Sequence, residues 1–201
     1  MNKKNKTKKV YDPKTALAAA DSFRRHSNSF IRKTGTNMKN AHKKAVNNLG
    51  ELIASATMLA LSLELYLKAL RMILDLSIPH THHLWSLYKT LPKEVKDSIE
   101  TDYDNDKLNR DVCGYVDTFQ IAIWVDGLGT NPPDRPDELD DLEQIDLKSV
   151  LVRSSDAFKT WRYMHEGGKV GQYAYYNYEF ARLELICNVV RSHIIKLLNN
   201  E

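Results

Sequence analysis

TMLALSLELYLKALRMILD, residues 57–75, is an apolar segment whose only charged residues are Glu64, Lys68, Arg71 and Asp75. At 100° per residue these four charges fall within a wedge of about 60° on a helix, and nearly every other direction is apolar. A helix of this kind is surrounded on most sides, as the central helix of a helical domain is. The segment therefore predicts an all-α fold built around this helix.

The charged wedge has two interpretations. In the first, it is a solvated stripe in which charges three and four positions apart form ion pairs. In the second, it is a charged seam that faces a groove or a twofold-related copy of the chain. The second interpretation makes Glu64, Lys68 and Arg71 candidate binding residues.

Apolar residues at intervals of three and four extend the central helix back to about residue 37, with a break or bend expected at Asn47-Asn48 and Gly50. Asp12-Pro13 is typical of an N-cap followed by proline at the first helical position. These patterns predict four or five long helices with short connecting helices and no sheet. The other helices are expected at residues 13–33, 84–91, 92–100, 146–167 and 180–199.

Residues 102–146 carry 13 acidic residues and 3 basic ones. One apolar stretch interrupts them, VCGYVDTFQIAIWV at 112–125, which we interpret as a helix or a buried hairpin between exposed loops. QYAYYNYEF, residues 172–180, is interpreted as a connection between helices. Its Tyr175 and Tyr176 are candidates for stacking on unpaired bases, because every base offers an aromatic face.

The net charge of +3 is unevenly distributed, since residues 1–44 hold 13 basic and 2 acidic side chains. This distribution favours contact with phosphates or with an acidic partner surface. Residues 1–12 are expected to form a flexible basic tail, and 13–201 a single domain. The candidate binding residues within the expected helices are Arg24, Arg25, Lys43 and Lys44.

Two cysteines, Cys113 and Cys187, are too few for a disulfide framework, and no apolar leader begins the sequence. We therefore expect a cytoplasmic protein with neither a metal site nor a cofactor. No membrane span is expected, because Glu64, Lys68 and Arg71 interrupt the longest apolar run. Glycine-rich phosphate loops and nucleophile-elbow motifs are absent from the sequence. Enzyme classes that depend on either motif are therefore not expected.

FKTWRYMHEGGK, residues 158–169, concentrates aromatic and ionisable side chains. On a helix Arg162 reaches His165 at i+3 and Glu166 at i+4. One interpretation is a helix end fixed by an Arg162–Glu166 ion pair. The other is a metal-independent ribonuclease site, in which an imidazole moves the 2′-hydroxyl proton and a guanidinium holds the phosphate. His82 is a further candidate binding residue, and it is also expected to cap or brace the short helix that follows it.

Three segments in order, LSLELYLKAL (61–70), THHLWSLYKTLP (81–92) and FKTWRYMHE (158–166), resemble the HEPN superfamily of small prokaryotic helical domains. The resemblance covers residues 45–199, with the 13–33 helix as an addition. It implies an up-and-down helical bundle, usually dimeric, of the kind found in toxin–antitoxin and phage-defence loci. Many members resemble ribonucleases that use Arg-x(4–6)-His, but no arginine in this chain is followed by histidine at that spacing.

The favoured function is therefore a non-catalytic module that binds RNA or a cognate protein partner as a homodimer. One alternative is a metal-independent ribonuclease that uses Arg162 and His165, with Glu166 in support. The other is an antitoxin-like or scaffold protein whose acidic 102–146 region docks on a basic partner.

Overall fold

The computed structural model describes residues 12–37, 45–107, 119–124, 146–163 and 169–199. Within these ranges the chain is predominantly helical, which confirms the predicted all-α class. The helices are α1 (Pro13–Asn37), α2 (Ala45–Ile73), α3 (Leu84–Tyr88), α4 (Lys93–Asp106), α6 (Leu147–Arg153), α7 (Ala157–Arg162) and α8 (Phe180–Asn199). The strands are β1 (Phe119–Trp124) and β2 (Tyr173–Tyr178).

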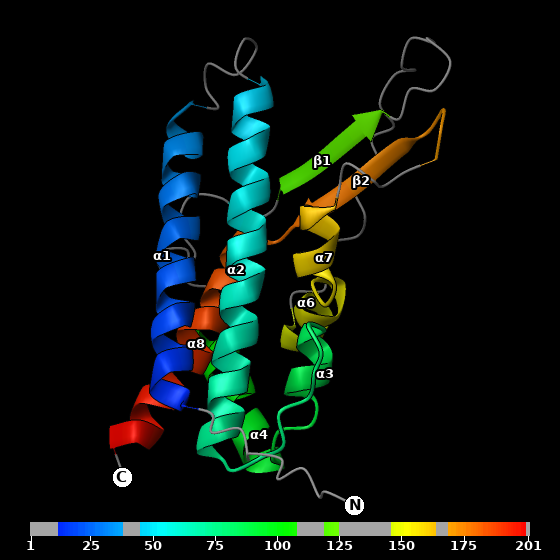
Figure 1. The fold of residues 1–201 in the computed structure, drawn as a ribbon. Coiled ribbons are helices and arrows are strands. Elements are labelled where there is room, and N and C mark those ends of the chain that lie inside the picture. The colour runs from blue at the N-terminus through cyan, green and yellow to red at the C-terminus, as the bar shows by residue number, and fades with distance from the viewer. Residues whose placement is uncertain (1–11, 38–44, 108–118, 125–145, 164–168, 200–201) are drawn as a thin grey trace, which may run out of the picture.

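Helix α2 is the centre of the fold. It contacts α1, α3, α7 and α8, and α1 runs antiparallel beside it along most of its length (Figure 1). Leu59, Leu63, Leu67 and Leu70 are fully buried between these elements. By length and composition α2 could also cross a membrane, but most of its apolar window is buried inside the fold, as in a core helix.

The break expected near Gly50 is wrong, because α2 continues without interruption from Ala45 to Ile73. A Cβ atom added at Gly50 would meet no atom within 4 Å. Glycine costs a helix only about 1 kcal/mol relative to alanine. Burial of the apolar residues that follow, beginning with Leu52 and Ala56, outweighs that cost.

Other elements follow the sequence patterns. The Asp12 carboxylate accepts hydrogen bonds from the backbone N–H groups of Lys14 and Thr15, both at 3.1 Å, and so caps α1. Helix α1 is longer than expected and ends at Asn37. Within the helix expected at 84–91, four apolar residues are buried: Leu84, Leu87, Tyr88 and Leu91.

The helix expected over 146–167 is divided into α6 and α7 by a turn at Ser154 and Ser155. Serine hydroxyls compete with the backbone for hydrogen bonds and so disfavour helix interiors. Here the Ser155 hydroxyl donates to the Leu151 carbonyl oxygen at 2.6 Å and accepts from the Trp85 N–H at 3.2 Å. The turn thereby fixes α7 relative to α3.

The expectation of no sheet is wrong, because an antiparallel two-stranded ribbon joins two distant segments. β1 lies in the stretch interpreted as a helix or a hairpin, and β2 is the tyrosine-rich stretch interpreted as a connection. Tyr176 and Tyr178 are buried, with ring centroids 6.1 Å and 5.3 Å from that of Trp161. The ribbon therefore packs on α7 through the aromatic residues of β2.

Candidate functional site

The three sequence segments that resemble the HEPN pattern meet at one place in the fold. Glu64 and Lys68 lie on α2, His82 lies in the connection before α3, and Phe158 and Arg162 lie on α7. We call these five residues the α2–α7 cluster. The cluster exists because α2 packs against both α3 and α7.

Glu64 is the buried anchor of the cluster, with only 2% of its surface exposed. Its Oε1 accepts a hydrogen bond from Lys68 Nζ at 2.6 Å, and its Oε2 lies 2.9 Å from His82 Nδ1. Lys68 reaches it because residues four apart share a helix face. A buried carboxylate needs such partners to offset its lost hydration.

The aromatic ring of Phe158 contacts two other side chains of the cluster. The His82 ring stacks on it with centroids 5.1 Å apart and an interplanar angle of 30°, and Arg162 Cζ lies 4.6 Å from its centroid. The imidazole and the guanidinium can be no further apart than the sum of these two distances. Cation–π contact and stacking hold both groups in defined planes.

Arg162 is the exposed cation of the cluster. Its Nη2 donates to the Tyr163 hydroxyl at 2.7 Å, and its Cζ also lies 4.4 Å from the centroid of the Tyr163 ring. Arg162 makes no ion pair with any residue in the described ranges. Aromatic rings therefore orient its charge, and no carboxylate among the described residues compensates it.

The contact between His82 and Glu64 determines what the imidazole can do. A carboxylate beside Nδ1 favours the tautomer that carries its proton on Nδ1, which leaves Nε2 as the hydrogen-bond acceptor. The His82 side chain is 48% exposed, so its outer edge is open to solvent. The cluster can thus offer a proton acceptor and a guanidinium from neighbouring positions.

Arg71, a predicted binding residue, is buried and forms hydrogen bonds inside the fold. It is 4% exposed, and its Nε and Nη2 donate to the Ser77 carbonyl oxygen at 2.9 Å and 2.6 Å. Its Nη1 donates to the Leu87 carbonyl oxygen at 3.2 Å and to Thr90 Oγ1 at 2.6 Å. The solvated stripe proposed for the wedge is therefore wrong for Glu64 and Arg71, and a binding role for Arg71 is not supported.

The predicted binding residues of α1 have different positions. Arg24 pairs with Glu184 of α8, Nη2 to Oε1 at 2.6 Å and Nε to both carboxylate oxygens at 2.9 Å and 3.0 Å. Burial alone would lower the pKa of Arg24, but the Glu184 carboxylate raises it above its ordinary value. Arg25 is exposed and has no ion-pair partner in the described part of the chain. The charge of Arg24 is thus compensated, and that of Arg25 is not.

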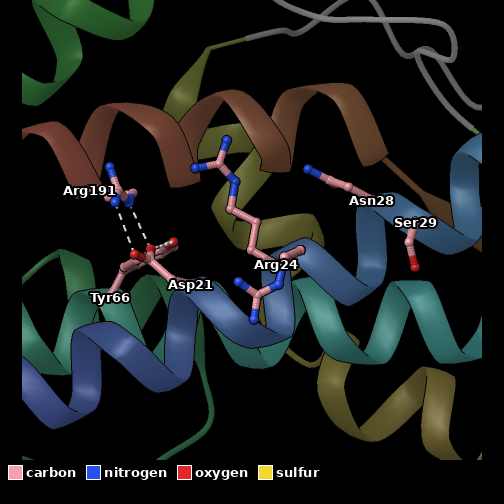
Figure 2. Close-up of a pocket in the computed structure, with 7 residues that line it drawn as sticks. Asp21, Arg24, Asn28, Ser29, Tyr66 and Arg191 are labelled. Atoms are coloured by element: carbon pink, nitrogen blue, oxygen red, sulfur yellow. Dashed lines mark hydrogen bonds and ion pairs between the residues drawn. The ribbon is translucent and has the colours of Figure 1, made fainter.

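A second pair joins the same helices. Arg191 of α8 donates to Asp21 of α1 through Nε at 2.7 Å and Nη2 at 2.9 Å, and the Tyr66 hydroxyl donates to Asp21 Oδ1 at 2.5 Å. Burial would raise the pKa of Asp21, but hydrogen bonds from Arg191 and Tyr66 hold it below its usual range. Burial and the Asp21 contact raise the pKa of Tyr66. These side chains line a groove between α1 and α8 (Figure 2).

Several predicted site residues are not placed in the cluster. His165, Glu166, Lys43 and Lys44 lie outside the described residues. Tyr175 belongs to β2, where it pairs with Ala122, but its side chain lies outside the description. Tyr176 is 7% exposed beside Trp161, and base stacking by its ring is not supported. Within the described ranges no three histidine, cysteine or carboxylate residues group as metal ligands do.

Sequence reasoning missed the role of Phe158 and the pairing of His82 with Glu64. The spacing of Phe158 fits an apolar helix face, and the side chain does pack against the core, but spacing alone does not reveal that its ring is only partly covered. His83, not His82, caps α3 by accepting from the Ser86 N–H at 3.3 Å. No family model, curated protein or solved structure matches the chain, so the arguments for function rest on the geometry of the cluster.

Proposed function

We propose that this protein is an RNA-binding helical module of HEPN-like type and that RNA contacts the α2–α7 cluster. The supporting observation is that three separate segments bring an exposed guanidinium, a half-exposed imidazole and a partly covered aromatic ring to one surface. That combination suits single-stranded RNA, which is bound through phosphates and through stacked bases. The HEPN resemblance of the same segments is consistent with this assignment.

Each exposed group has a defined part in this proposal. Arg162 donates to phosphate oxygens, because its fork of N–H groups suits a tetrahedral oxyanion and carries a full charge. Lys159, exposed on the same helix, adds a second phosphate contact. Tyr163 is 43% exposed and offers a ring for stacking next to the guanidinium. Glu64 holds His82 in place by direct contact, and Lys68 supports Glu64 as its ion-pair partner.

The resemblance also implies a homodimer, which would present two such surfaces. Two linked sites bind a single RNA more tightly than either alone when the strand can span them. We therefore propose that the RNA-binding form is a dimer. A dimer would show a molar mass near twice the chain mass of 23.1 kDa by light scattering under the conditions in which RNA binds.

Fluorescence anisotropy with labelled single-stranded RNA tests the proposal. Affinity should fall between about 50 and 200 mM salt, with a log–log slope of about −0.7 for each phosphate contacted. Arg162→Gln should weaken binding about tenfold and reduce that slope by about 0.7. Lys14→Gln, which removes an exposed charge on α1 outside the cluster, is the matched control. Binding that does not change with salt, or equal loss in both variants, would contradict the proposal.

A second candidate function is metal-independent RNA cleavage, favoured by the His82–Glu64 contact of 2.9 Å. His82 Nε2 would accept the proton of a 2′-hydroxyl as the 2′-oxygen bonds to phosphorus. The 5′-oxygen would leave and take a proton from water, which yields a 2′,3′-cyclic phosphate. Arg162 would stabilise the negative charge on the phosphate.

Incubation of labelled RNA with the protein in the presence of a chelator separates the two functions. Cleavage that ends in cyclic phosphate and is lost in His82→Ala, with RNA binding retained, supports the enzyme. Intact RNA with wild-type protein supports the binding module. Cleavage that survives His82→Ala would reject the role assigned to that imidazole.

A further inference from the structure

The groove between α1 and α8 is a second candidate site, distinct from the α2–α7 cluster. It has a volume of about 580 Å³ and is lined by Asp21, Arg24, Arg25, Asn28, Ser29, Tyr66 and Arg191. Figure 2 shows Arg191 of α8 turned toward Asp21 of α1. The lining thus contains three guanidinium groups.

Two of these guanidinium groups are fixed in orientation. Glu184 holds Arg24 through Nε and Nη2, and Asp21 holds Arg191 through the same two atoms. In neither arginine does Nη1 form a hydrogen bond within the described part of the chain. Each pair therefore orients a guanidinium while leaving donors unused, which is the preorganisation that favours binding of an anion.

Arg25 supplies the uncompensated charge. It is exposed on α1 and makes neither an ion pair nor a side-chain hydrogen bond with another described residue. Three arginines against the carboxylates Asp21 and Glu184 give this region one net positive charge. An anion entering the groove therefore gains a charge partner without breaking either existing pair.

One buried hydrogen-bond acceptor in the wall of the groove has no donor. Asn28 Nδ2 donates to Glu184 Oε1 at 2.8 Å, while Asn28 Oδ1 is buried and has no hydrogen-bond partner in the described structure. A buried acceptor without a donor costs about 1–3 kcal/mol. A ligand that brings an O–H group near this amide would satisfy it after a small side-chain rotation.

We propose that the groove binds a small tetrahedral oxyanion that carries a proton, of the hydrogen phosphate type. Arg25 and the unused Nη1 groups of Arg24 and Arg191 donate to its oxygens, and its O–H group donates to Asn28. The size of the groove also accommodates a small organic group attached to the phosphate. The site therefore accepts either free phosphate or a small phosphorylated compound through the same oxygens.

Isothermal titration calorimetry with inorganic phosphate at constant ionic strength tests this site. Wild-type protein and Lys14→Gln should bind phosphate equally, and Arg25→Gln should bind it about tenfold more weakly, because it loses the charge-assisted hydrogen bonds of one guanidinium. Arg25 is exposed and makes no ion pair or side-chain hydrogen bond with a described residue, so this variant should unfold near the wild-type temperature. Absence of phosphate binding, or equal binding by Arg25→Gln, would overturn the proposal.

Two further titrations define the ligand. Sulfate has the charge and shape of phosphate but no proton at neutral pH, so it should bind more weakly to wild-type protein and equally with phosphate to Asn28→Ala. Equal binding of sulfate and phosphate by wild-type protein would reject the role of Asn28. Glycerol phosphate that binds more tightly than free phosphate would identify a phosphorylated compound as the ligand, and weaker binding would identify phosphate itself.

Phosphate binding in the groove can be tested separately from RNA binding at the α2–α7 cluster. Arg162→Gln, designed to weaken RNA binding, should leave phosphate binding unchanged, and Arg25→Gln should leave RNA binding at the cluster unchanged. If Arg25→Gln weakened RNA binding and phosphate did not bind, the groove would be part of the RNA surface. That outcome would overturn the small-anion site and keep the RNA proposal.

Discussion

Replacement of Arg71 by methionine tests the structural role of the charged wedge on α2. Methionine keeps much of the apolar stem of arginine and removes its guanidinium. The guanidinium donates four hydrogen bonds, to the Ser77 carbonyl, the Leu87 carbonyl and Thr90 Oγ1. These contacts fix the connection between α2 and α3, where His82 lies.

The expected loss of stability follows from those contacts. Hydrogen bonds to charged groups contribute about 1.5–3 kcal/mol each, and a carbonyl left buried without a donor costs about 1–3 kcal/mol. These terms are not additive, and removing a buried charge returns part of its desolvation cost. That cost is visible in the pKa of Arg71, which burial lowers. We expect Arg71→Met to lower the free energy of unfolding by about 2–4 kcal/mol.

Urea denaturation followed by far-UV circular dichroism measures this loss. Arg71→Lys should recover little of it, because an ammonium group cannot reproduce the planar fork that reaches both carbonyls. Arg25→Met, a change at an exposed arginine, should alter stability by no more than about 0.5 kcal/mol. A loss below about 1 kcal/mol in Arg71→Met would refute the reasoning, since the four contacts would then have little net effect on folding.

Three further changes test local features of the fold. Gly50→Ala should raise the free energy of unfolding by about 0.5–1 kcal/mol in urea denaturation, because the added Cβ meets no atom within 4 Å and alanine favours the helix. A decrease in the free energy of unfolding would contradict a continuous α2 at this position. Asp75→Gly should raise the thermal midpoint of unfolding, because Asp75 has φ of 50° at the end of α2 and its carboxylate lies beside the negative helix terminus. Asp75→Ala, which retains the backbone strain, should not produce the same gain. The Asp146 hydrogen bonds at the start of α6 lower its pKa from 3.8, so its contribution to stability is present well above pH 3.8 and is lost as the pH falls through the lower, folded-state value. Asp146→Asn keeps an N-cap acceptor but cannot titrate, so its stability should fall less than that of wild type on acidification below about pH 5; identical pH profiles would reject this assignment.

Sequence periodicity predicted the buried faces of this protein better than it predicted where elements end. The helices expected at 84–91 and 180–199 form and bury apolar residues such as Leu87 and Val190, and Asp12 caps α1 as expected. The division between α6 and α7 was missed because Ser155 gains its partners from α3, which a local pattern does not contain. The break at Gly50 was wrongly expected for the opposite reason, since tertiary packing carries α2 through a poor helix former.

The candidate site was predictable in part. The i,i+4 spacing of Glu64 and Lys68 gives their contact directly. The pairing of His82 with Glu64 depends on how the connection after α2 folds back, and the partners of Arg24 lie about 160 positions away in α8. A helical wheel shows which charges share a face. It cannot show which of those charges another element will neutralise, and this difference separates Arg24 from Arg25.

An NMR titration of the labelled protein with single-stranded RNA tests most directly whether the α2–α7 cluster binds RNA. The account predicts that amide shifts concentrate at residues 81–83 and 158–163, and that Arg162→Gln reduces their size at a given RNA concentration while Lys14→Gln does not. Shifts confined to α1 and α8, or no shifts at low salt, would contradict it.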